Sequence, residues 1–397
     1  MKGAFLMKVL EKETVEEIKE VKTESKKRDI SIELIRVVAA LLVVAIHLSL
    51  QVYNQYYSQV DWSRLFEKCF FTDGVPLFFM ITGFFIANGR SYKKTWKGVA
   101  KKILLPTFIY VLIAQVFYMF ITNKQSIAWC LQNAVNNLNI QGIFRAILTG
   151  DVIHINSLCA HLWYIFSHIK IVLWMPVLWL ICKNEKTPNL ARRMIMGFGI
   201  LSLVFQDIQK FVPSLNDFVN PFTMVDPVIL YVLFGYELFV NKDKIKNNKK
   251  LCIISLVIFA LINVVKYKLE MQYMVINNFF DIVGRSSFLE WKYTSFNIIS
   301  SICLFMALYS FEIKSEKLSK IISWISDKTF GIYLIHYMLI AKVDLYKFDK
   351  YGKLTEELIY LVLSILITFT SSLIIVWLLK KITSLCSSGV KKLHKSK

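Results

Sequence analysis

The amino-acid sequence predicts an all-α, polytopic membrane protein of about ten transmembrane helices, with both termini in the cytoplasm. Apolar residues make up 55% of the 397 residues and charged residues only 19%, whereas a soluble domain carries about 25% charged residues. The apolar residues form long runs along the whole chain without a long polar break, which only a lipid solvent accommodates. The basic residues concentrate in alternate connecting segments, as the positive-inside rule requires.

Taken in order, a polar arm of mixed Glu and Lys (residues 1–29) precedes the apolar runs and is expected in the cytoplasm. The runs lie at roughly 31–51, 74–89, 103–121, 161–182, 194–210, 222–240, 251–267, 294–312, 329–342 and 357–379. Two of them are near 15 residues, short of the ~20 needed to span a bilayer, and must recruit flanking residues or tilt little. We therefore predict an arm at 1–29, a transmembrane domain at 30–383 and a basic cytoplasmic tail at 384–397.

The distribution of positive charge supports ten spans. With the N-terminus inside, 33 of the 48 Lys and Arg fall in the inner segments, and 13 fall in the outer loops or in the last two residues of the runs that lead into them. Every inner segment is at least as basic as any outer one. The net charge of +20 then reflects orientation and attraction to anionic membrane lipids. Because no basic patch sits on a soluble module, nucleic acid is not an expected partner.

The seven cysteines are scattered without metal-ligand spacing, and we predict no metal site. Most of them read as small buried hydrophobic residues. Cys130 and Cys159 share the longest predicted outer segment, residues 122–160, so a disulfide between them stays open. Apolar residues at helical spacing near the start of that segment predict an interfacial helix.

The first apolar run contains three ionisable residues, Glu33, Arg36 and His47. At 100° and 1.5 Å per residue, all three fall within one narrow stripe of an α-helix, and His47 stands about 16 Å beyond Arg36. Ionisable groups inside a spanning helix are costly and therefore mark functional sites by default. Two plainer interpretations remain: an i,i+3 ion pair at a helix start, and a histidine that reaches the outer headgroups.

These residues are similar to a known family. Glu33-Leu-Ile-Arg36 followed by His47 resembles the first-helix signature of the acyltransferase 3 family. Four later blocks resemble further motifs of that family, in family order: Gly74-Val-Pro-Leu-Phe-Phe-Met-Ile-Thr-Gly83, His161-Leu-Trp163-Tyr164 with Pro176, Phe234-Gly235-Tyr236, and Thr329-Phe-Gly-Ile-Tyr333-Leu-Ile-His336. The family also has about ten spans.

The resemblance implies an acyl-CoA donor, acetyl-CoA or another, used from the cytoplasmic side, with no bound cofactor. It implies as acceptor a hydroxyl of a surface or lipid-linked glycan. Some members carry an Arg-x-x-Arg pair on the first inner loop, whereas this chain offers lysines there, Lys101 and Lys102 among them. Lysine binds phosphate as a point charge rather than as a fork. Some members also carry an outer esterase-like domain, so transfer here is expected to be direct or to involve a separate extracytoplasmic transferase.

The predicted site therefore has a catalytic set, Glu33, Arg36 and His47, and a set of substrate-binding candidates. These candidates are Trp163, Tyr164, Tyr333, His336, Lys101 and Lys102. Each has a plainer interpretation: Trp163 and Tyr164 as aromatic-belt anchors, and His336 as a hydrogen-bonded interior histidine.

We interpret the chain as a multi-pass cell-membrane O-acyltransferase that moves an acyl group, expected to be acetyl, to a glycan hydroxyl. A hydroxyl is a poor nucleophile without a base, which is the role expected of His47. The main alternative is a transporter or flippase of a glycan precursor that uses the same intramembrane charges. A weaker one is an inactive acyltransferase-like domain in a sensory or assembly protein.

Overall fold

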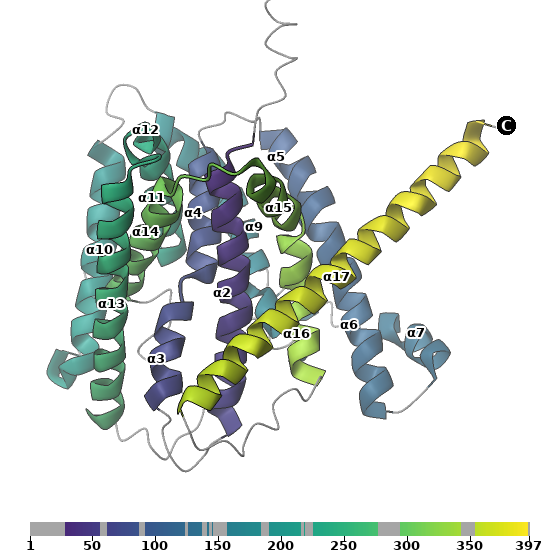
Figure 1. Ribbon diagram of the computed structural model, residues 1–397, viewed down its shortest axis with the longest axis horizontal. Helices are drawn as coiled ribbons and strands as arrows, with labels where there is room; N and C mark the ends of the chain where they lie inside the picture. Colours follow the sequence, from purple (N-terminus) through teal and green to yellow (C-terminus); the bar gives the residue numbers. More distant parts are fainter. Residues whose placement is uncertain are drawn as a thin grey trace, which may run out of the picture.

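The computed structural model describes residues 28–55, 62–86, 92–123, 126–136, 141–142, 145, 157–183, 190–215, 218, 225–276, 294–342 and 354–395. All but the last two residues of the predicted N-terminal arm lie outside these ranges. Every regular element within them is helical and none is a strand, so the predicted all-α class is confirmed (Figure 1).

Each predicted apolar run contains a helix, and further helices lie in the segments between the runs. In chain order they are α2 Ile30–Gln55, α3 Trp62–Phe71, α4 Gly74–Ile86, α5 Tyr92–Val99, the π-helix η1 Ala100–Leu104, α6 Leu105–Asn123, α7 Ile127–Asn136, the 3-10 helix η2 Ser157–Leu162, α9 Trp163–Lys183, α10 Leu190–Phe211, the 3-10 helix η3 Pro213–Leu215, α11 Pro227–Val240, α12 Lys242–Ile245, α13 Lys249–Ile276, α14 Ser295–Ser310, α15 Glu316–Ser326, α16 Thr329–Lys342 and α17 Leu354–Lys395. α7 forms where apolar spacing predicted an interfacial helix.

Six described helical stretches are long and apolar enough to cross a membrane, which confirms a polytopic membrane protein. They are Ile30–Ser49, Lys68–Ile86, Tyr92–Phe117, Cys159–Cys182, Lys249–Tyr273 and Leu358–Ser384. Shorter apolar helices occupy Pro227–Val240, Ser295–Ser310 and Thr329–Ile340, and α10 covers the remaining run. The number of crossings and the side of each terminus stay predictions.

The short second run gains its length from α3. Residues Thr72 and Asp73 form a turn between α3 and α4, so the Lys68–Ile86 stretch is a helix broken near its start. Gly74 opens α4 at a close approach to α2: a Cβ there would lie 2.9 Å from the Ala39 carbonyl oxygen and 2.9 Å from the Val43 backbone nitrogen. Only glycine allows this contact without displacement.

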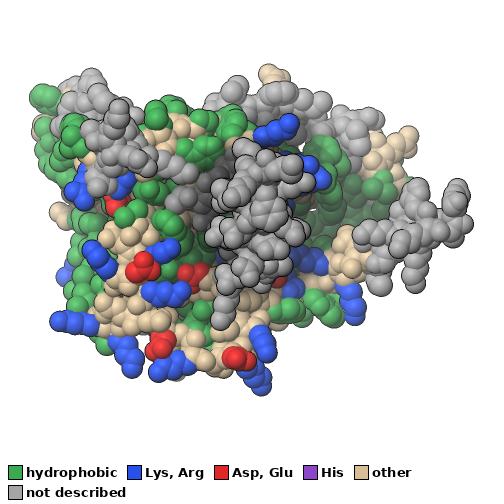
Figure 2. Space-filling model, turned by 90° about the horizontal axis from the view of Figure 1, so that it is seen from above, with side chains coloured by type: hydrophobic (Ala, Val, Ile, Leu, Met, Phe, Trp, Pro, Cys, Tyr) green, Lys and Arg blue, Asp and Glu red, His purple; other side chains and the backbone are tan. Residues whose placement is uncertain are grey.

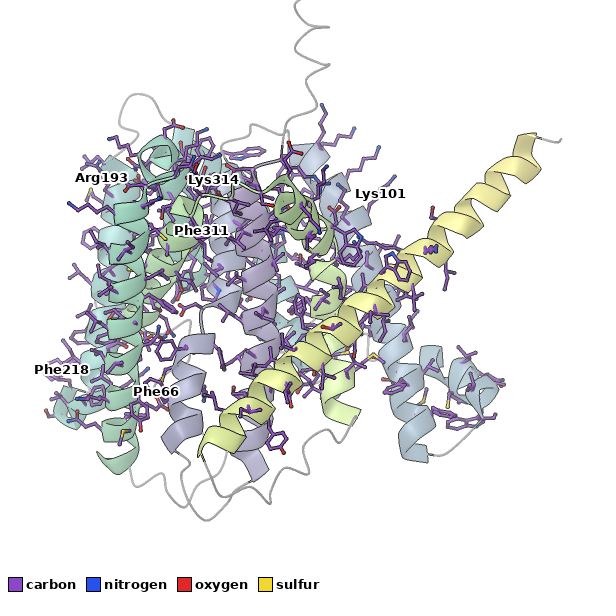
Figure 3. All side chains as sticks on the ribbon, in the orientation of Figure 1. Phe66, Lys101, Arg193, Phe218, Phe311 and Lys314 are labelled. Atoms are coloured by element: carbon purple, nitrogen blue, oxygen red, sulfur yellow. The ribbon has the colours of Figure 1, made fainter. Side chains whose placement is uncertain are left out.

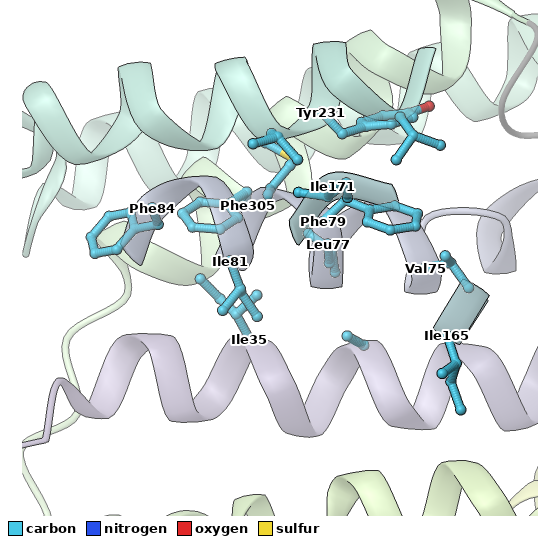
Figure 4. Packing of buried hydrophobic residues seen from close by; sticks show 14 of the residues in the cluster. Ile35, Val75, Leu77, Phe79, Ile81, Phe84, Ile165, Ile171, Tyr231 and Phe305 are labelled. Carbon is cyan, nitrogen blue, oxygen red and sulfur yellow. The ribbon is translucent and has the colours of Figure 1, made fainter. Parts of the chain in front are cut away.

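The core lies where α2, α4, α9, α11 and α14 meet. Figure 4 shows part of it, with Ile35, Phe79, Ile165 and Phe305 among the labelled side chains, all buried. Helices α4 and α11 pack through glycines: a Cβ on Gly83 would stand 1.8 Å from the Val232 carbonyl oxygen. Small residues of this kind let membrane helices approach backbone to backbone.

Basic side chains gather at one end of the bundle. Figure 3 labels Arg193, Lys314 and Lys101 toward the end where α2 begins, and Phe66 and Phe218 toward the opposite end. Figure 2 views the first end and shows many Lys and Arg with a few Asp and Glu between them. The three labelled cations come from three predicted inner segments, so this is the arrangement that the charge alternation predicts.

The disulfide left open by the sequence is absent. Cys130 and Cys159 are both free and buried. They belong to different apolar clusters, since Cys130 packs with Met119 while Cys159 joins the main core.

Candidate functional site

Three histidines from distant parts of the sequence meet inside the bundle. They are His47 on α2, His161 on η2 and His336 on α16. The centroid of the His336 ring lies 5.1 Å from that of His47 and 5.3 Å from that of His161. Tyr337 stacks on His161 with ring centroids 4.9 Å apart. Within the described residues, no group of three His, Cys, Asp or Glu side chains has a metal-binding arrangement.

Backbone carbonyls set the protonation of two of these rings. His47 Nδ1 lies 2.7 Å from the Val43 carbonyl oxygen, and His336 Nδ1 lies 2.7 Å from the Tyr333 carbonyl oxygen. A carbonyl only accepts, so we assign the proton of each neutral ring to Nδ1. Each Nε2 then carries a lone pair. His336 Nε2 stands 3.3 Å from His47 Nδ1 and can accept a share of that proton.

Within the part of the chain that the structure describes, no hydrogen bond occupies His47 Nε2, so its lone pair can accept a proton as a general base does. If Nε2 takes up a proton, the positive charge spreads to the Nδ1–H group. That group already faces two acceptors, the Val43 carbonyl and His336 Nε2. Hydrogen bonds to a charged donor are about twice as strong as neutral ones, so His336 favours the protonated form of His47.

Aromatic residues surround the histidines. The Tyr333 hydroxyl donates to the His161 carbonyl oxygen, and the Tyr333 ring lies 5.5 Å from that of Tyr164. Tyr164 also packs 4.9 Å from Phe79. Trp163 is half-buried against the core. Packing thus brings His336 to His47, and the Tyr333 ring lies 6.0 Å from that of His336. Tyr164 joins the cluster through Tyr333 rather than standing in an open aromatic belt.

Glu33 and Arg36 lie on α2 but away from the histidines. Arg36 donates to Glu33 at 2.9 Å, and Ser326 at the end of α15 donates to the other Glu33 oxygen. The guanidinium carbon lies 5.5 Å from the centroid of the Phe85 ring. The Arg36 side chain keeps 31% of its surface exposed, against 6% for Glu33. The ion pair predicted from i,i+3 spacing therefore exists, and the Arg36 guanidinium stays partly exposed.

Lys101 and Lys102 are exposed on the π-helix η1 and do not join the histidines. Pro106 explains this local geometry, because it has no N–H to bond the Lys102 carbonyl four residues back. π-Helical turns are rare and often occur at functional sites. Lys101 lies near the end of the bundle where α2 begins (Figure 3), and Lys102 is the next residue of η1.

The comparison with protein families agrees with the motif order. A family model described as an acyltransferase domain, Acyl_transf_3, matches residues 29–377. The chain belongs to the acyltransferase 3 family. The protein is thus an acyltransferase with membrane-spanning helices. Searches of the curated proteins and of the solved structures each found no match.

The five acyltransferase 3 blocks have two distinct structural roles. The first, third and last blocks supply the histidine cluster through His47, His161 and His336. The second and fourth blocks pack against each other, because Gly83 approaches α11 and Gly235 approaches α4. Sequence reasoning quoted His161 within a motif but did not select it as a site residue, and it did not consider Tyr337. The sequence held a signal for both: His161 begins the third block, and Tyr337 directly follows His336 of the last block.

Proposed function

We propose that this acyltransferase 3 protein moves an acetyl group from acetyl-CoA to a hydroxyl of a cell-surface or lipid-linked glycan, in the cell membrane. The observation that carries the proposal is the assigned Nδ1–H form of His47, which leaves Nε2 free inside the bundle with His336 behind it. A hydroxyl needs a base at this position, and family membership supplies the acyl-transfer chemistry.

The proposed transfer exchanges a thioester for an ester and needs no oxidant or reductant. The acceptor hydroxyl gives its proton to His47 Nε2 while its oxygen attacks the thioester carbonyl carbon. The carbon–sulfur bond then breaks, and His47 gives the proton to the sulfur of the departing CoA thiolate. An ester and a free thiol result. His336 contributes by holding Nδ1–H and so stabilising the charged ring during the step.

Charge at the other end of α2 supports the donor assignment. Arg36 keeps part of its guanidinium exposed although it pairs with Glu33. Guanidinium groups match phosphate oxygens in a bidentate way, and CoA carries several phosphates. Lys101 adds exposed positive charge near the same end (Figure 3), and the neighbouring Lys102 is exposed as well. We propose that Arg36 is the principal donor contact and that the two lysines attract the nucleotide.

The aromatic group beside the histidines supports a saccharide acceptor. Sugar rings present apolar faces that pack on aromatic rings, and the Tyr333 ring lies beside those of His161 and His336. Tyr164 packs against Tyr333. We propose them, together with Trp163, as the surface along which the acceptor glycan is guided. Transfer is direct in this scheme, and a separate extracytoplasmic transferase would act only after the first ester forms.

Mass analysis of surface glycans tests the proposal. Cells that produce the protein should carry O-acetyl groups that cells without the gene lack, and His47→Ala should remove them while the protein remains in the membrane. Ser49→Ala is the matched control, because Ser49 is buried two residues further along α2 and donates only to the Ala45 carbonyl. Glycans that disappear altogether without the gene, rather than losing acetyl groups, would instead identify a transporter.

A further inference from the structure

A second group of buried charges lies apart from the histidines, at the break between α3 and α4. Asp73 occupies the break, and Lys266 comes from the middle of α13. Both side chains are fully buried, with 0% of their surface exposed. Lys266 stands at the end of an apolar run, and nothing in the acyl-transfer scheme above uses either residue.

The two charges are held by hydroxyl groups from neighbouring helices. The Lys266 ammonium donates to the Thr72 hydroxyl at 2.8 Å and lies 3.8 Å from a carboxylate oxygen of Asp73. The other carboxylate oxygen accepts from Ser300 at 2.7 Å and from Ser301 at 2.6 Å, both on α14. The network therefore ties the broken helix to α13 and α14 at one point.

Burial of these two charges opposes folding. Burying two charges costs several kcal/mol each before their attraction is counted, and replacing a buried pair by apolar residues is often neutral or stabilising. Ionisable residues within membrane bundles are accordingly rare and tend to serve function. Interrupted spanning helices also need partners for the backbone groups released at the break. Stability alone is a weak reason for this pair.

The break packs closely against α2, the helix that carries His47. Gly74, the residue after Asp73, abuts the backbone of α2 at Ala39 and Val43. The carbonyl of Val43 is the group that His47 Nδ1 contacts at 2.7 Å. We infer that Asp73 and Lys266 are positioning residues for His47, which act by fixing the break and hence the stretch of α2 that carries the Val43 carbonyl. The inference rests on the proposed role of His47.

The test separates positioning from stability. Asp73→Asn/Lys266→Met removes both charges together, so no uncompensated charge remains. Purified full-length protein in lipid nanodiscs is assayed with acetyl-CoA and with surface glycan extracted from the producing cell. We expect kcat to fall about 10–100-fold, as small misplacements of a catalytic group do, while acetyl-CoA affinity and the thermal midpoint stay near those of the wild type. Gly74→Ala should show the same split between kcat and donor affinity.

A second buried pair provides the matched control. Arg192 on α10 and Glu237 on α11 are joined at 2.7 Å, with the Arg192 side chain 3% exposed. Arg192→Met/Glu237→Gln should change the thermal midpoint without changing kcat. Unchanged kcat in the folded Asp73/Lys266 double variant would overturn the inference. A wild-type protein that transfers nothing would instead overturn the proposed function.

A variant that keeps the pair covers the case in which the double variant does not fold. Ser301→Ala removes one of the two hydroxyl donors to Asp73 and leaves both charges in place. We expect a smaller fall in kcat with donor affinity retained. A kcat equal to that of the wild type in this variant would also overturn the inference.

Discussion

Substitution of His336 tests the histidine pair most directly. His336 Nε2 stands 3.3 Å from His47 Nδ1 and has no other proposed role in the chemical step. His336→Leu removes this acceptor and leaves the Val43 carbonyl as the only partner of Nδ1–H. A hydrogen bond to a charged group contributes about 1.5–3 kcal/mol. At 1.36 kcal/mol per factor of ten, its loss in the transition state lowers kcat about 10–150-fold.

The assay measures CoA thiol released from acetyl-CoA by purified protein in nanodiscs, with extracted surface glycan as acceptor. His47→Ala should cost more than His336→Leu, about 10²–10⁴-fold for loss of a general base. Because His336 is proposed to act through His47, adding His336→Leu to His47→Ala should cost nothing further. Effects that multiply in the double variant would refute the pair and assign His336 an independent role. Thermal midpoints of all three variants serve as the folding control.

Three further predictions concern the ends and the core of the bundle. Glu33→Gln/Arg36→Gln should fold but bind acetyl-CoA weakly by calorimetry; undiminished binding would leave Arg36 as scaffold that only neutralises Glu33. Gly83→Ala should destabilise by about 1–3 kcal/mol in a thermal unfolding assay because α4 and α11 must separate, whereas Gly98→Ala, with nothing within 4 Å of its added Cβ, should be neutral or stabilising. A single cysteine at exposed Lys314 should react with an impermeant maleimide only from the cytoplasmic side, and labelling from outside would reverse the predicted orientation.

The fold was largely predictable because the lipid requirement is local. A run of about 20 apolar residues must span as a helix whatever its neighbours are, so the runs could be located without tertiary information. The break at Thr72 and Asp73 was not predictable in this way. Both residues preceded a short apolar run and looked like the end of an outer loop, whereas α3 extends the span beyond them.

The site was predictable only in pieces. Helical periodicity put Glu33, Arg36 and His47 on one stripe because they share one helix. No periodicity joins His47 to His336, which lies 289 residues away. The family resemblance supplied both residues, but it could not reveal that they face each other. The sequence did not single out Lys266, because a lysine at the end of an apolar run ordinarily extends to the headgroups. Here its ammonium group stays buried against Thr72 and Asp73.

The eleven helical steps from Arg36 to His47 define a length as well as a direction. They span about 16 Å along α2. If the phosphates of the donor rest at Arg36, its thioester must extend about that far into the bundle, a span that the flexible pantetheine arm of CoA can bridge. A short thioester without phosphates, such as S-acetyl-N-acetylcysteamine, would gain nothing from Arg36 and should be equally poor with or without that side chain. Arg36 then recognises the phosphates of the donor and not the acyl group at the far end of the arm, so the choice between acetyl and longer acyl groups falls to the aromatic residues around His47.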